Sequence, residues 1–192
     1  MYAYGNDDIA PSLLKEISES ERLLVWSYRR WIAGMRSREE AHWKLVWREV
    51  NCIFDADSGR SILGGLQSII AGIGLHARRT LRLHPPCCGY ICADELSFVT
   101  LIGACQRRDY RTARGIAEWL VQEEGMSGVL EGAGRIATVL SEHRLYLPDQ
   151  SSRQNELNTI DAEASSESQE GLSDPALYED PADFAERARD RL

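Results

Sequence analysis

The chain has 192 residues, of which 43 % are hydrophobic, so it is long enough for one ordinary globular domain and an additional segment. The whole net charge of −8 lies in residues 149–192, where 12 acidic side chains face 4 basic ones, while residues 1–148 carry 18 of each sign. A neutral domain with an acidic tail disfavours nucleic-acid binding, which depends on a cationic surface. The longest apolar run, residues 62–77, is too short to cross a bilayer and is interrupted by polar residues and glycines, so we expect no membrane span.

The N-terminus and the cysteines indicate the compartment. The first residues do not form the basic stretch followed by an apolar stretch that marks a secretory leader. The chain has five cysteines, an odd number, and they do not form an even framework along it. These features predict a cytoplasmic protein with reduced thiols.

Helical periodicity dominates from residue 18 onward, after an N-terminal extension over residues 1–17. Ser18 and Glu21 fit a capping box for a first helix, and Gly34 suits its end. Ser37 and Glu40 repeat the capping pattern for a second helix. The residues predicted to be buried on these two helices are Leu24, Tyr28, Trp31, Ile32, Trp43, Val46, Val50, Ile53 and Phe54, and Cys52 is also expected in the core.

A turn over residues 55–59 should lead into a third helix, in which apolar residues repeat from Ile62 to Ala77. Two of its glycines, Gly65 and Gly72, lower helix propensity but allow a neighbouring helix to approach closely. Asp94 is the expected N-cap of a fourth helix that runs to residue 105.

Asp109 is the expected cap of a fifth helix ended by Gly125, and Ser127 begins a sixth that stops before Pro148. Convincing period-two alternation is lacking throughout. The sequence therefore predicts an all-α domain over residues 18–148, built as a compact bundle of about six helices with short connections.

The composition changes after Pro148. Residues 149–176 are polar and acidic, and such a segment cannot bury enough apolar surface to offset its ordering entropy, so we expect a disordered linker. Residues 177–192 regain a helical pattern, with Phe184, Ala188 and Leu192 on one stripe. We interpret this short amphipathic helix as a docking segment for a protein partner.

A loop rich in cysteine lies between the third and fourth helices, with the sequence HPPCCGYIC. Zinc prefers four sulfur or nitrogen ligands, frequently supplied at short spacing, so a structural zinc or iron–sulfur site is one interpretation. A thiol-redox site is another, because Cys92 precedes a helix whose N-terminus favours a thiolate. A third is a tight turn whose cysteines are simply buried. The candidate metal ligands are His84, Cys87, Cys88, Cys92 and, one helix later, Cys105.

The sequence has no nucleophile elbow, no H-E-x-x-H motif and no phosphate loop. Gly132, Gly134 and Ala137 match the dinucleotide fingerprint, but the strand that must precede it is not predicted, so we interpret them as small residues at a helix contact. We therefore expect a non-enzymatic helical protein for protein interaction or regulation, adaptor-like, with no cofactor. The alternative is a zinc, iron–sulfur or thiol-redox protein built on the cysteine loop.

Overall fold

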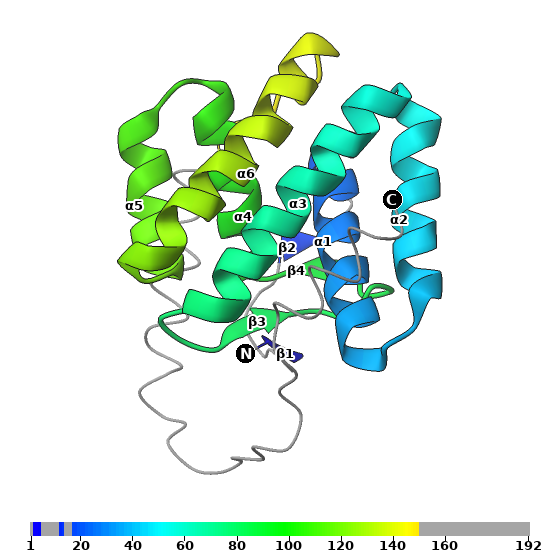
Figure 1. The fold of residues 1–192 in the computed structure, drawn as a ribbon, viewed down its shortest axis with the longest axis horizontal. Helices are drawn as coiled ribbons and strands as arrows, with labels where there is room; N and C mark the ends of the chain where they lie inside the picture. Colours follow the sequence, from blue (N-terminus) through cyan, green and yellow to red (C-terminus); the bar gives the residue numbers. More distant parts are fainter. Residues whose placement is uncertain (1, 5–11, 14–16, 150–192) are drawn as a thin grey trace.

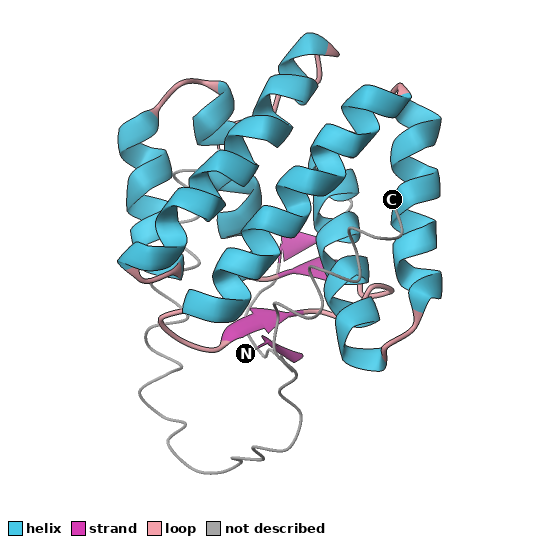
Figure 2. Ribbon diagram, viewed as in Figure 1, coloured by secondary structure: helices cyan, strands magenta, loops and turns pink. Residues whose placement is uncertain are grey.

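The computed structural model describes residues 2–4, 12–13 and 17–149. The described part of the chain is all-α, with six helices, as the periodicity predicts (Figures 1 and 2). The linker 149–176, beyond Asp149, and the amphipathic segment 177–192 lie outside the described residues. The helices are α1 (Glu19–Ser37), α2 (Glu40–Ile53), α3 (Ala56–His76), α4 (Ala93–Gln106), α5 (Tyr110–Leu120) and α6 (Glu123–Glu142).

Helix α4 lies at the centre of the bundle. Every residue from Ala93 to Ala104 is buried, which is the pattern of a helix covered on all sides. Helix α1 packs on it through Tyr28, whose ring stacks on that of Phe98 with the centroids 4.5 Å apart. Helices α2 and α5 lie at opposite sides of the bundle, and α3 and α6 lie side by side in front of α4 (Figure 1).

The α3–α6 contact depends on glycine, as the sequence predicts for Gly65. A Cβ atom added at Gly65 would lie 2.6 Å from the carbonyl oxygen of Gly132, and one added at Gly132 would lie 2.5 Å from that of Gly65. Because these distances are far below van der Waals contact, the two backbones can cross at this point only if both residues lack a side chain. Gly72 repeats the arrangement, since a Cβ atom added there would lie 2.7 Å from the Val129 Cγ2 atom.

Several predicted helix ends are wrong. Helix α1 continues through Gly34 to Ser37, and Arg38 follows it in the left-handed conformation. Gly34 instead leaves room for Trp43, since a Cβ at Gly34 would lie 2.7 Å from the Trp43 Nε1 atom. The Ser37–Glu40 capping box does not form, and α2 begins without a side-chain cap. Helix α4 is capped at Cys92 rather than at Asp94.

Other predicted ends and burials have mixed outcomes. The Ser18–Glu21 capping box and the Asp109 cap are both present. Helix α5 ends at Leu120 rather than near Gly125, and Gly125 is part of α6. Two residues of α2 expected in the core, Cys52 and Ile53, are exposed.

Four short strands accompany the helices and have no counterpart in the sequence prediction. Strand β1 (Tyr2–Tyr4) pairs in parallel with β3 (Leu81–Leu83), and β2 (Ser12–Leu13) pairs antiparallel with β4 (Tyr90–Ile91). Both pairs join the N-terminal extension to the segment between α3 and α4, and the β1–β3 pair lies near the end of α3 (Figure 2). The cysteine loop therefore begins after β3, contains β4 and ends at the start of α4.

Candidate functional site

The cysteine loop is fixed at both ends by the start of α4. Its first residue, His84, follows β3, and its last, Cys92, is the N-cap of α4. Between them the backbone turns at Pro85, whose carbonyl oxygen accepts a hydrogen bond from the Cys88 N–H at 2.9 Å.

Glu95, in the first turn of α4, is the polar centre of this region. Its carboxylate accepts hydrogen bonds from the backbone N–H of His84 at 2.9 Å and of Cys92 at 3.0 Å. The Arg29 side chain donates to both oxygens, through Nε at 2.7 Å and Nη2 at 2.8 Å. The Arg29 and Glu95 side chains are 1 % and 0 % exposed, so this is a fully buried bidentate ion pair with charge-assisted hydrogen bonds.

Arg29 also holds the loop itself. Its Nη1 donates to the carbonyl oxygen of Cys88 at 2.8 Å, and its Nη2 donates to that of Tyr90. One guanidinium from α1 thus joins the loop, β4 and the first turn of α4. A buried charge requires such complete hydrogen bonding, since an unpaired one would be very costly.

A neighbouring carboxylate anchors the other end of the segment. Asp94 accepts from the backbone N–H of Arg82 at 2.6 Å and forms an ion pair with Arg79. The Arg79 guanidinium lies 3.9 Å from the ring centroid of Trp119, within cation–π distance. The segment from Arg79 to β3 is therefore held to α4 and α5 by polar contacts that flank the apolar core.

The structure gives Cys92 a chemical character opposite to that expected from its position. Burial, together with the nearby carboxylates of Glu95 and Asp94, raises the pKa of the Cys92 thiol well above its usual value. The Sγ atom lies 3.3 Å from the carbonyl oxygen of Arg82, to which the thiol donates. The neutral thiol is therefore favoured, although a helix N-terminus by itself favours a thiolate.

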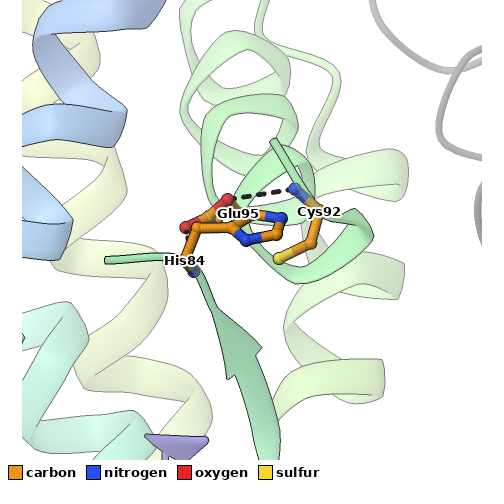
Figure 3. Close-up of side chains that lie close together, drawn as sticks. All are labelled: His84, Cys92 and Glu95. Carbon is orange, nitrogen blue, oxygen red and sulfur yellow. Dashed lines mark hydrogen bonds between the residues drawn. The ribbon is translucent and has the colours of Figure 1, made fainter. Parts of the chain in front are cut away.

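Two of the five candidate metal ligands come together. His84 and Cys92 lie with Glu95 in one buried group, whose ligand atoms are all within 4.8 Å of one another (Figure 3). Cys87 is exposed, Cys88 and Cys105 are half-buried, and none of these three joins that group among the described residues. Burial raises the pKa of the Cys105 thiol, near the end of α4, to about 11.

The sequence prediction missed Glu95 and Arg29, the two residues that hold this region together. The signal for Glu95 is its spacing: it lies three residues after Cys92, where an N3 glutamate reaches back to the N-cap backbone. Arg29 gives no comparable signal, because it lies on α1 among several other arginines and 66 residues from its partner.

A second candidate site is the outer surface of α2. Only Val46 and Val50 are buried on this helix, and the indole N–H of Trp43 donates to the Trp31 carbonyl oxygen at 3.2 Å. Trp47 is 36 % exposed and Ile53 is 47 % exposed, although both border the buried stripe. The apolar face of α2 is therefore wider than the area that α1 and α3 cover.

Comparison of the chain with protein-family models, with curated proteins and with solved structures finds no match. Within the described ranges, no helix has the length and apolar content needed to cross a membrane.

Proposed function

We propose that this protein is a non-enzymatic helical interaction or regulatory protein, adaptor-like, that binds a protein partner. The observation that supports this proposal is that α2 exposes two large apolar side chains, Trp47 and Ile53, one on each side of its buried stripe. Single exposed apolar residues are common, but here two large ones border the same buried stripe. Tryptophan is also enriched among the residues that dominate binding at protein interfaces.

The C-terminal segment supplies a second part of the proposal. Phe184, Ala188 and Leu192 would form one apolar stripe if residues 177–192 were helical. A helix this short is marginal alone in water, so it would fold on an apolar groove of the partner. The α2 surface and this segment give the partner two separate contacts, whose affinities would combine.

Affinity capture with matched variants tests the α2 surface. We expect Trp47→Ser and Ile53→Ser to lose the partner that wild type captures, while Glu49→Ser, an exposed change on the same helix, retains it. With that partner purified, calorimetry should show binding weakened at least about tenfold, because loss of an interface tryptophan costs roughly 2 kcal/mol or more. Phe184→Asp tests the C-terminal segment in the same assay. If the Trp47→Ser/Ile53→Ser double variant binds the purified partner as tightly as wild type does, the α2 proposal is wrong.

The second candidate function is metal binding or thiol-redox chemistry at the cysteine loop. Its support is the proximity of His84, Cys92 and Glu95, all of them buried. The contacts of Glu95 oppose it, because four N–H groups already use the lone pairs of that carboxylate and the Arg29 guanidinium would repel a cation. A zinc site would therefore take His84 and Cys92 and need further ligands, for which Cys87 and Cys88 are the nearest in sequence.

Elemental analysis of protein purified without oxygen tests this second candidate. If a structural metal is bound, stoichiometric zinc or iron should be found, and Cys88→Ser/Cys92→Ser should remove it and lower the melting temperature together, since the binding energy of a structural metal contributes to folding. The Cys52→Ser variant, at an exposed position on α2, is the control and should change neither quantity. Wild-type protein without metal would end the metal hypothesis.

A further inference from the structure

The turn between α4 and α5 carries a group of arginines that the bundle leaves exposed. We define the basic corner as Arg107, Arg108 and Arg111, which follow one another from the end of α4 into the first turn of α5. The turn is closed by hydrogen bonds from the Asp109 N–H to the Ala104 carbonyl oxygen at 2.9 Å and from the Arg108 N–H to the Cys105 carbonyl oxygen at 3.0 Å. The corner is therefore a fixed feature of the backbone.

Arg108 occupies a backbone position that normally favours glycine. Its φ angle is 60°, in the left-handed region, where a residue with a Cβ atom is strained. Glycine would relieve that strain but would remove the guanidinium. Arg38 and Arg144 hold the same conformation after α1 and α6, so the arginine at 108 is one of three that close a helix in this way.

The charges on this corner are not balanced by its surroundings. Among the described residues, neither Arg108 nor Arg111 has a carboxylate partner. The nearest carboxylate in the chain, Asp109, caps α5 by accepting from the Thr112 N–H at 3.1 Å, and these contacts with Thr112 lower the pKa of Asp109. Arg114, one turn further along α5, is already paired with Glu118 at 2.7 Å.

Arg107, the remaining arginine of the basic corner, contacts the residues that lead into the acidic segment. Arg107 donates to the carbonyl oxygens of Leu147 at 3.4 Å and Pro148 at 3.3 Å, and its Nη2 atom lies 3.4 Å from the Asp149 carboxylate. The chain thus leaves the bundle on the basic corner. Residues 150–176 then carry 6 acidic side chains and only 1 basic one.

We propose that the acidic segment 150–176 folds back and docks on the basic corner. Its tether at Asp149 keeps the segment at a high effective concentration near Arg108 and Arg111, so ion pairs with these two guanidiniums, each weak alone, can hold it without a defined fold. The attraction should be strong at low ionic strength and lost when the Debye length falls well below about 10 Å. The proposal goes beyond the proposed function, because it stands whether or not residues 177–192 bind a partner.

Small-angle scattering of the full chain at increasing salt concentration separates a docked from a free segment by the sign of the change. A docked segment is released by screening, so the radius of gyration should rise between about 20 mM and about 500 mM NaCl. A free acidic segment repels itself and is extended at low salt, so the radius should fall over the same range. A fall in the wild-type radius, or a radius that does not change, would overturn the proposal.

Two double variants test whether the basic corner causes the salt-dependent change in the radius of gyration. Arg108→Glu/Arg111→Glu should have a larger radius than wild type at low salt and should shrink as salt is added. The control Arg22→Glu/Lys44→Glu makes the same charge change at exposed positions on α1 and α2, away from α5 (Figure 1), and should behave as wild type. If the control and the corner variant behave alike, the acidic segment does not recognise the corner.

Arg108→Gly removes one cation of the basic corner in a variant that is expected to fold stably, so that its result does not depend on misfolding. Glycine relieves the strained φ angle, so the midpoint of urea unfolding should rise. The salt-dependent expansion should nevertheless become smaller, because one cation of the corner is gone. A more stable protein with an undiminished expansion would show that Arg108 has no part in docking.

Discussion

Replacing Glu95 with alanine is expected to lower the free energy of unfolding by about 3–5 kcal/mol, because it leaves the buried Arg29 guanidinium without its anion. Arg29→Met should cost a similar amount, since the Glu95 carboxylate would then be buried with only backbone donors. Urea unfolding followed by circular dichroism measures both losses.

The double variant Arg29→Met/Glu95→Leu separates the ion pair from the rest of the contacts. It buries no charge, so it should lose clearly less stability than the two single variants together. It should still be less stable than wild type, because the Cys88 and Tyr90 carbonyl oxygens lose their donor.

A surface ion pair provides the control for this experiment. Arg114 and Glu118 form an exposed pair within α5, and Arg114→Ala should change stability by less than about 1 kcal/mol. Strict additivity of the Arg29 and Glu95 variants would contradict the coupling that the structure implies.

The second large effect is expected where α3 crosses α6. Gly65→Ala or Gly132→Ala should destabilise the bundle by about 1–3 kcal/mol, because the new methyl group would overlap a backbone carbonyl oxygen that no side-chain rearrangement can move. Thermal unfolding measures the loss as a lower melting temperature.

Gly134→Ala is the matched control on α6. No heavy atom lies within 4 Å of its added Cβ, so only the gain in helix propensity remains, and stability should rise by up to about 1 kcal/mol. Opposite signs at Gly132 and Gly134, two residues apart, would confirm the crossing point. Equal effects would mean that the helices do not approach each other there.

Helices α1, α2, α3, α5 and α6 were predictable because each has an apolar face with the helical period, whereas α4 is buried on all sides. The closely packed Gly65 is also visible in the sequence. The errors come from tertiary contacts. Gly34 has a position typical of a helix end, but it lies within α1, and its lack of a side chain makes room for Trp43. The strands are only two or three residues long, too short for a period of two to be recognised.

The candidate site was predictable only in part, because its central contacts are also tertiary contacts between residues far apart in the sequence. His84 and Cys92 are candidates because they lie close together in the chain, and they do share one buried group. The ion pair at its centre joins Arg29 to Glu95 across 66 residues, and each charge alone resembles an ordinary helix-surface residue. Burial of Glu95 follows from the covering of α4 on all sides, which a single sequence does not reveal.

The pairing of β1 with β3 has a consequence for how the chain matures during synthesis. Tyr2 is paired with Leu81, so the first strand cannot be completed until α1, α2 and α3 have all been made. At about 5–20 residues per second, this interval is roughly 4–16 seconds. The ion pair between Arg29 and Glu95 can form only later still, after residue 95 has been synthesised. During those seconds α1, α2 and α3 can pack on one another, but the apolar residues that they later bury against α4 remain uncovered.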